Sequence, residues 1–422
     1  MNSVRTLYVC YFGLREPLVQ TQVLPYLRQL RSEQVAISLL TFEPRLHETW
    51  TSEELSQQRA ALSAEGISWH YLKYHKRPSL PATIYDMALG AWTVMRLMKR
   101  EGVRIVHARN HVPAVMGAVA RKLKGARMVF DIRGFMPEEY TDAGVWPEHG
   151  YLYRGLKRVE RYLLDVSDAF VVLTEKARAL VFPGCSDRDS RGRPIEVIPC
   201  CVDFARFAAA GETDRDTTRA ELKLAGRRVI VYVGSFGGWY LTDEMSEFLA
   251  VAQEQDPATF SLILTQSPGE LVSKKLVQLG IDQQDFLVTQ VTPAQVPRYL
   301  QAADIAISFI KPCYSKQSSS PTKIAEYLAS GLPLVCNAGV GDLDKLIEAN
   351  GAGVLLHDFN RAAYLKALEQ IDAMRAEKNL AARLREVARQ EFDLEKVGRV
   401  RYRRLYERLL HRMRSERTFA DS

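Results

Sequence analysis

Strand-like and helix-like segments alternate along almost the whole chain, and this alternation restricts the fold more than any other feature. Apolar runs typical of strands occupy, in the first half, Val4–Tyr11, Val35–Thr41, Val103–His107, Ala126–Asp131, Ala169–Thr174 and Ile195–Ile198. Between them, apolar residues recur with helical spacing over Gln20–Arg31, Thr83–Arg100, Ala114–Leu123 and Leu152–Leu164. Because the strands are apolar on both faces, we expect parallel sheets that are covered by helices on both sides.

The second half repeats this pattern. Its strand-like runs are Arg228–Val233, Phe260–Thr265, Phe286–Thr289, Ile305–Ile310, Pro333–Cys336 and Gly353–Leu356. A length of 422 residues also favours two or three domains. The sequence therefore predicts an α/β fold of two doubly wound, Rossmann-like domains that face a cleft, over residues 1–205 and 206–392, with a polar linker near Asp203–Asp216. Ligands of such sheets bind beyond the carboxyl ends of the strands.

Composition excludes several classes of function. The net charge of +7 is modest for this length, so we do not expect nucleic acid as a partner, whereas an anionic small molecule or a membrane surface fits. The six cysteines form no CxxC pair and match no zinc spacing, which favours a reduced, cytoplasmic protein without a metal or cofactor. No apolar run reaches the roughly 18 residues that span a bilayer, and the start of the chain is interpreted as a strand rather than a signal peptide.

The segment from Ser318 to Val335 is the most informative part of the chain. Ser320 is a suitable N-cap and Pro321 suits the first position of a helix, while Gly331 ends that helix and Pro333 prevents its continuation. These residues predict a helix of about ten residues that is fixed at both ends.

The start of this helix has the chemistry of an anion site. Free backbone N–H groups would lie there beside the Lys323 ammonium group and the hydroxyls of Ser319, Ser320 and Thr322, which suits a phosphate. Glu326 follows Lys323 by three residues, so its carboxylate lies on the same face and can accept hydrogen bonds from a ribose diol. Together they predict a nucleoside diphosphate site; the alternative is a capped core helix with a surface Lys–Glu pair.

This segment resembles the donor-binding helix of the retaining glycosyltransferases with the glycosyltransferase-B fold, family four (group 1). Glu326 matches the second glutamate of their Glu-x7-Glu motif and Ser330–Val335 matches the run after it, whereas Ser318 stands at the first glutamate. Ile198–Phe207, Ala302–Ile307 and Tyr232–Gly238 are similar to the interdomain segment, the strand before the donor loop and the first strand of the donor domain.

The resemblance implies a retaining, metal-independent transfer of a sugar from a nucleotide-sugar donor to a glycan or lipid-linked acceptor. It also implies a role in cell-envelope polysaccharide synthesis, which is common in the family. It places Gly13, Gly234 and Ser235 near the donor. The family's Arg and Lys of the donor loop are replaced by Ser235 and by Trp239 or Tyr240, so Lys323 is expected to supply the charge. Arg133 stands where many relatives have a histidine beside the transferred sugar, and His111 is a further candidate contact; with Lys323 they are the predicted catalytic residues.

Three alternatives remain open. The chain could instead be a nucleotide-sugar epimerase on the same fold, or a non-catalytic nucleotide-sugar-binding protein, since the first glutamate and the Arg/Lys pair are missing. The C-terminal segment, residues 393–422, is expected to form a helix that packs back on the first domain and ends in a polar tail; a membrane-surface helix is the alternative. Peripheral contact with the inner face of a membrane is a related expectation, for which the basic Tyr74–Pro78 run is a candidate.

Overall fold

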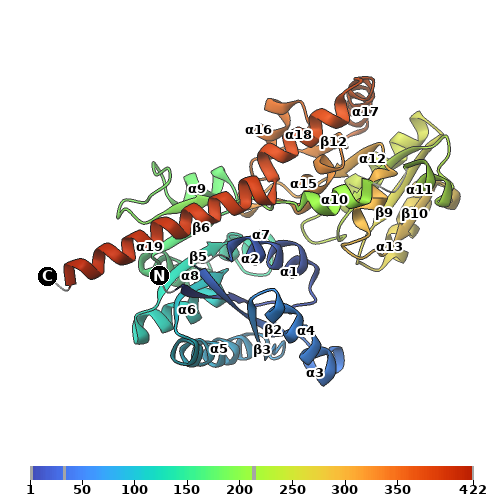
Figure 1. Ribbon diagram of the computed structural model, residues 1–422. Coiled ribbons are helices and arrows are strands. Elements are labelled where there is room, and N and C mark those ends of the chain that lie inside the picture. The colour runs from blue at the N-terminus through green and yellow to red at the C-terminus, as the bar shows by residue number, and fades with distance from the viewer. Residues whose placement is uncertain (1–2, 32–34, 212–214, 421–422) are drawn as a thin grey trace. The chain divides into compact units, whose positions relative to one another are not determined.

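A computed structural model describes residues 3–31, 35–211 and 215–420 of the chain, which form two compact units (Figure 1). The first unit comprises Met1–Pro199 and Gly398–Ser422, and the second comprises Cys200–Val397. The chain thus leaves the first unit after Pro199, whereas the expected boundary was residue 205. Part of the expected linker, residues 212–214, lies outside the described residues, as does the end of the expected tail, residues 421–422.

A parallel sheet of seven strands forms the centre of the first unit, in the order β3-β2-β1-β4-β5-β6-β7. The strands are β1 (Val4–Cys10), β2 (Val35–Glu43), β3 (Ile67–Lys73), β4 (Val103–Arg109), β5 (Arg127–Ile132), β6 (Ala169–Val172) and β7 (Ile195–Val197). All strands expected in this half are present. In addition, β3 forms one edge of the sheet, although no strand was expected over its residues.

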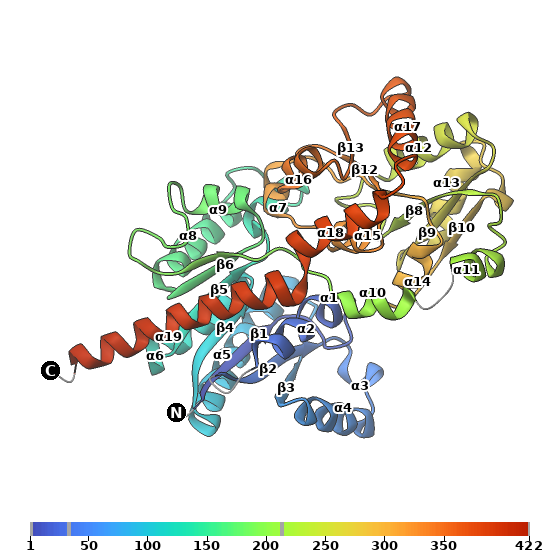
Figure 2. The same cartoon turned by 45° about the horizontal axis from the view of Figure 1, so that its top comes forward.

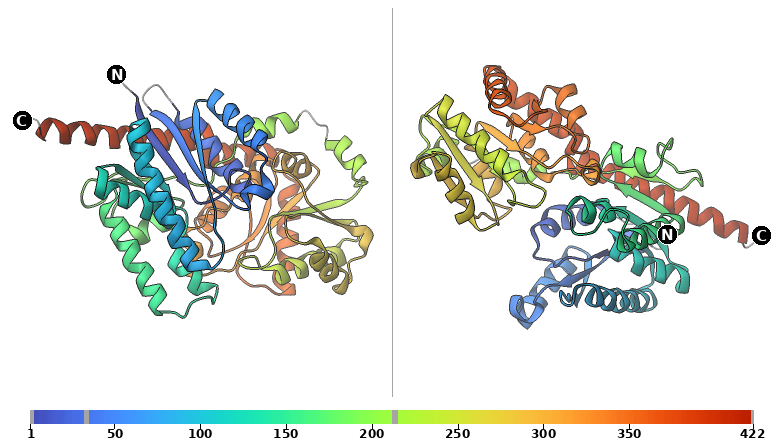
Figure 3. Two further views of the ribbon diagram at one scale, coloured as in Figure 1. Left: turned by 90° about the horizontal axis from the view of Figure 1, so that it is seen from below. Right: turned by 180° about the vertical axis from the view of Figure 1, so that it is seen from behind.

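The two faces of this sheet carry different helices. Leu7 and Val9 of β1 share a core cluster with Ala91 and Val94 of α5 (Ser79–Glu101) and with Met116 of α6 (His111–Lys124). Tyr8, between them in the pleat, contacts His107 with its ring tilted by 36°, and the His107 ring in turn stacks on Tyr406 of α19 (Val400–Ala420). Helices α5 and α6 and the C-terminal helix α19 therefore lie on opposite sides of the sheet (Figure 3). The sheet is covered on both faces, as its apolar strands predicted.

One predicted helix is wrong in detail. Gln20–Arg31 was expected as a single helix, but the structure has α1 (Pro17–Gln22) and α2 (Leu24–Leu30), which are separated at Val23. Pro25 lies in the first turn of α2, where its missing N–H costs nothing, but it cannot continue a preceding helix. The other helices of this unit are α3 (Leu46–Thr49), α4 (Ser52–Ala64), α7 (Met136–Asp142), α8 (Tyr151–Val166) and α9 (Glu175–Val181).

The second unit has a parallel sheet of six strands in the order β10-β9-β8-β11-β12-β13. Its strands are β8 (Arg228–Val233), β9 (Thr259–Leu264), β10 (Phe286–Thr289), β11 (Ile305–Ser308), β12 (Leu334–Asn337) and β13 (Gly353–Leu356), so every strand expected here is present. The helices are α10 (Phe204–Gly211), α11 (Arg215–Glu221), α12 (Thr242–Gln255), α13 (Gly269–Gln278), α14 (Val296–Gln301), α15 (Thr322–Ala329), α16 (Leu343–Asn350), α17 (Arg361–Arg375) and α18 (Leu380–Phe392). Separate apolar clusters lie on the two faces of the sheet.

The C-terminal helix α19 is attached to the sheet of the first unit, along which it runs in Figure 2. The Tyr406 hydroxyl lies 2.9 Å from His107 Nδ1, and Arg133 donates a hydrogen bond of 2.7 Å to the Tyr402 hydroxyl. Arg404 adds two hydrogen bonds of 2.7 Å to the Glu196 carboxylate. In the described part of the chain, no helix is long and apolar enough to cross a bilayer.

Candidate functional site

Helix α15 lies in the second unit, after β11 and a short 3₁₀ turn at Tyr314–Ser318. The prediction that Ser320 caps this helix is wrong: the N-cap is Pro321, in an extended conformation, and no side chain caps the helix. The Ser320 hydroxyl instead accepts a hydrogen bond of 3.0 Å from the Cys200 N–H, so it anchors the segment that enters the unit. The helix has eight residues rather than about ten, and it ends before Gly331, which has the positive φ of 79° that only glycine adopts easily.

Lys323, in the first turn of α15, lies in a cage of aromatic side chains. Its Nζ lies 3.2 Å from the Tyr232 hydroxyl and about 4 Å from the centres of two rings, at 4.3 Å for Tyr232 and 4.1 Å for Tyr240. Gly234 touches the same ammonium group: a Cβ at Gly234, whose φ is +146°, would overlap Nζ. Burial in this cage lowers the pKa of Lys323 to about 7, against a smaller opposite effect of the Glu326 carboxylate.

Glu326 lies one turn further along the same face of α15 and is also buried, at 7 % exposure. Burial raises the pKa of Glu326 to about 7, although the positive charges of Arg206 and Lys323 act in the opposite direction. Arg206, on α10, approaches the Glu326 carboxylate at 3.8 Å and donates a hydrogen bond to the Pro293 carbonyl. Two buried groups of opposite charge, with pKa values moved toward neutrality, are typical of a binding or catalytic site.

The loop after β8 carries Trp239 and Tyr240, the residues that were expected in place of the family's lysine. Trp239 and Tyr240 pair with the segment after β11: the Lys311 N–H donates a hydrogen bond of 2.8 Å to the Trp239 carbonyl, and Tyr240 forms a bridge with Ile310. The Trp239 ring covers Lys316, whose Nζ lies 4.0 Å from the ring centre. Aromatic rings of this loop thus lie over two lysines, Trp239 over Lys316 and Tyr240 over Lys323.

The structure brings several predicted donor residues together and leaves others apart. Gly234, Lys323 and Glu326 form one cluster, and Thr322 is the first residue of the helix that carries it. Ser319 precedes this helix, whereas Ser235 is exposed and its carbonyl accepts a hydrogen bond of 2.6 Å from Tyr232. Gly13 belongs to the first unit, where it packs against Pro44 so closely that a Cβ would lie 2.6 Å from the Pro44 ring.

Two residues of this site were missed. Arg206 and Lys316 belong to segments that are distant from Glu326 and Trp239 in sequence, so no local pattern pairs them. The available signal was their position: Arg206 lies in the run that resembled the family's interdomain segment, and Lys316 lies two residues before the segment that resembled the donor-binding helix.

Arg133 and His111, two of the predicted catalytic residues, already have partners in the first unit. The Arg133 guanidinium lies 2.7 Å from the buried Asp131 carboxylate and also binds Tyr402. Burial alone would raise the pKa of Asp131, but the positive charge of Arg133 holds it well below its usual range. His111 is buried, with Nε2 3.0 Å from the Glu160 carboxylate. These contacts stabilise the unit, and a catalytic role for either residue stays a prediction.

Comparison with known proteins identifies the family of both halves. Residues 20–206 match Glycosyltransferase Family 4, and residues 214–391 match Glycosyl transferases group 1. Over 265 residues, 61% of this chain and 59% of the other, the chain is 28% identical to a Bacillus subtilis (strain 168) protein that carries the name teichuronic acid biosynthesis glycosyltransferase TuaC. It is 25% identical over 163 residues to spore coat protein SA of the same organism, 36% of this chain and 41% of that protein. The chain therefore spans about three fifths and two fifths of the lengths of these relatives.

Solved structures show the fold. Sucrose-phosphate synthase of Thermosynechococcus elongatus superimposes with a TM-score of 0.68 at 16% identity, over 99% of this chain and 100% of that one. HepE of Anabaena, solved in complex with UDP and glucose, superimposes with a TM-score of 0.67 at 14% identity, over 97% and 99%. Both confirm the predicted glycosyltransferase-B fold, and at these identities they show the fold alone. With family matches that run through both units, the chain belongs to the group 1 glycosyltransferases of family four.

Proposed function

We propose that this chain transfers a sugar, with retention and without a metal, from a nucleoside-diphosphate sugar to a glycan or lipid-linked acceptor in cell-envelope polysaccharide synthesis. The observation that carries the proposal is the pair Lys323 and Glu326, both buried and one turn apart at the start of α15. The name of the TuaC relative supports the cell-envelope setting, and HepE, solved also with UDP-glucose, supports the donor class.

The diphosphate would lie at the start of α15. Backbone N–H groups of the first turn and the Lys323 ammonium group supply positive charge there, and Gly234 leaves the space above Nζ free of a side chain. During transfer, negative charge grows on the departing diphosphate while the sugar becomes oxocarbenium-like. Groups that are already oriented toward that charge lower the barrier without reorganising, and a lysine in this position can take the part of a metal cation.

The ribose would lie one turn further along the helix. The Glu326 carboxylate can accept two hydrogen bonds, and a diol offers two donors at the matching separation. The Arg206 guanidinium, 3.8 Å from the carboxylate, lowers the pKa of Glu326 against the larger effect of burial and so favours the ionised form that the diol needs. A nucleotide site differs from a simple anion site because it needs a cation for the diphosphate and, beside it, an anion for the ribose hydroxyls.

A donor screen followed by a transfer assay tests this proposal. We expect one class of nucleoside-diphosphate sugar to raise the melting temperature of the protein. With a mixed pool of acceptors, this donor should release nucleoside diphosphate, and NMR of the product should find the anomeric configuration of the transferred sugar unchanged. Activity should persist in the presence of a chelator.

A matched pair of variants links the activity to the site. Lys323→Met should greatly reduce the rise in melting temperature that the donor causes, whereas Lys366→Met, at an exposed position of α17, should retain it. A donor that is only epimerised, or bound without turnover by a folded protein, would contradict the proposal in favour of an epimerase or a binding protein. Inversion would contradict retention alone.

A further inference from the structure

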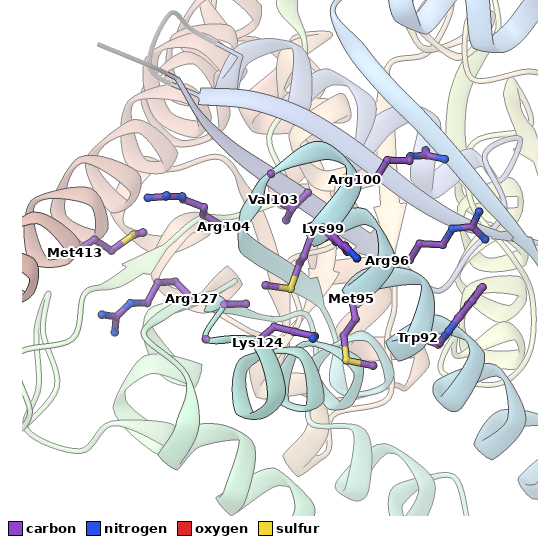
Figure 4. Close-up of a pocket in the computed structure, with 14 residues that line it drawn as sticks. Trp92, Met95, Arg96, Lys99, Arg100, Val103, Arg104, Lys124, Arg127 and Met413 are labelled. Atoms are coloured by element: carbon purple, nitrogen blue, oxygen red, sulfur yellow. The ribbon is translucent and has the colours of Figure 1, made fainter.

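A basic pocket of about 1170 Å³ lies at the amino-terminal edge of the sheet in the first unit. Its lining includes the first residues of β4 and β5, so it lies at the opposite edge of this sheet from the carboxyl ends. None of the described residues that line it is acidic. Six of its 14 lining residues are basic: Arg96, Lys99, Arg100, Arg104, Lys124 and Arg127. Figure 4 shows these side chains, which come from α5, β4, α6 and β5.

Most of this charge is not neutralised. Arg127 forms an ion pair with Asp168 and contacts Glu416, and Arg100 pairs with Glu101. For the other four, the described part of the chain offers no carboxylate within ion-pair distance: Arg96, Lys99, Arg104 and Lys124. Like charges that are gathered without counter-charges repel one another, so a site of this kind gains free energy when it binds an anion.

The outer face of α5 is apolar where a helix in water is normally polar. From Ser79 to Met95 the only charged residue is Asp86, which is fully buried and accepts a 2.7 Å hydrogen bond from the Tyr11 hydroxyl. Four large side chains of this stretch expose more than half of their surface: Leu80, Ile84, Tyr85 and Trp92. An apolar stripe that faces outward along a long helix indicates a surface that binds something apolar.

The apolar stripe and the basic pocket form one continuous surface. Trp92 belongs to both, because it is exposed on α5 and also lines the pocket. Arg96 and Lys99 follow Trp92 by four and seven residues, spacings that keep them on the same side of the helix. The neighbouring helix α6 continues the pattern with exposed Leu123 beside Lys124. Together, α5, α6 and α8 carry ten Lys or Arg and four Asp or Glu, and two of these acids, Asp86 and Glu160, are buried.

We propose that this surface binds an anionic phospholipid membrane, with α5 lying in the headgroup region and the basic pocket holding a lipid phosphate. Apolar residues beside basic ones, with an aromatic residue between them, are the pattern of a helix that lies in a membrane interface. A nucleic acid would use the cations but would gain nothing from Leu80 and Ile84. The proposal deepens the proposed function by naming its membrane-contact surface, and its test uses no sugar transfer.

Vesicle co-sedimentation of the full chain tests it. Two compositions are compared: phosphatidylcholine alone, and phosphatidylcholine with about one third phosphatidylglycerol. We expect binding to the anionic vesicles only, and weaker binding at high salt. A cation near an anionic surface is worth about fivefold in partitioning, so Lys99→Gln with Lys124→Gln should weaken binding about 30-fold. The matched double variant in the second unit, Lys345→Gln with Lys366→Gln, should change it less than twofold.

Trp92 separates insertion from electrostatic attraction. Its fluorescence should shift to shorter wavelength on anionic vesicles, and Trp92→Phe should remove that shift while it retains most of the binding. Three outcomes would overturn the proposal: equal binding to both vesicle types, equal loss of binding in both double variants, or binding of free inorganic phosphate without vesicle binding. So would a dimer that Trp92→Arg converts to a monomer. Donor stabilisation measured on the same samples distinguishes this failure from failure of the sugar-transfer proposal.

Discussion

Binding of a nucleoside diphosphate should take up a proton at Lys323. In the free protein, burial between Tyr232 and Tyr240 lowers the pKa of this lysine to about 7, from an ordinary value of 10.5. A diphosphate beside Nζ favours the charged form and returns the pKa toward its ordinary value. Above pH 7 the free lysine is mostly neutral and the bound one is protonated, so affinity must fall as pH rises.

The size of the effect follows from that pKa. Between about pH 7.5 and about pH 8.5 the protonated fraction of a lysine with a pKa of about 7 falls about eightfold, and the dissociation constant should rise by the same factor. Calorimetry in buffers of different ionisation enthalpy should find that the number of protons taken up on binding rises toward one per nucleotide as the pH is raised. Lys323→Met should bind more weakly and lose this dependence, whereas Glu326→Gln should retain it. An equal pH dependence of the dissociation constant in the wild type and in Lys323→Met would show that another group takes up the proton.

Three further predictions concern single contacts. Gly234→Ala should weaken donor binding at least tenfold in titrations, because its Cβ would overlap Lys323, whereas Gly237→Ala, also at positive φ but in open space, should not. Arg133→Met should lower the free energy of unfolding by about 3 kcal/mol in urea, because it leaves the buried Asp131 without its closest cation; a loss below about 1 kcal/mol would contradict the buried pair. Ser320→Ala should cost about 1 kcal/mol in the same assay through the lost Cys200 hydrogen bond, and unchanged stability would count against that contact.

Much of the fold could be predicted because the relevant signals are local. Apolar strand runs identified every strand of the second unit, and Gly331 with Pro333 located the end of α15. Strand β3 was missed because its burial is uneven, with Trp69 buried and its neighbours only half-buried. Helix α4 could have been found, since Thr51 and Glu54 form a capping box with the standard spacing.

The site was predictable in its helix and not in its surroundings. Lys323 and Glu326 are three residues apart, so helical periodicity alone places them on one face. The ring of Tyr232, about ninety residues away in sequence, reaches Lys323 only through the pairing of β8 with β11. The partner of Ser320 was wrong for the same reason. A hydroxyl before a helix usually accepts a hydrogen bond from an N–H of the first turn, but the Ser320 hydroxyl accepts one from the distant Cys200 N–H.

A crystal structure of the chain with a bound nucleoside diphosphate is the sharpest test of a nucleotide site at the start of α15. We expect phosphate oxygens within hydrogen-bond distance of Lys323 Nζ and of the first N–H groups of α15, and both ribose hydroxyls to donate to the Glu326 carboxylate. A nucleotide bound elsewhere, or one whose ribose leaves Glu326 in contact with Arg206 alone, would contradict it.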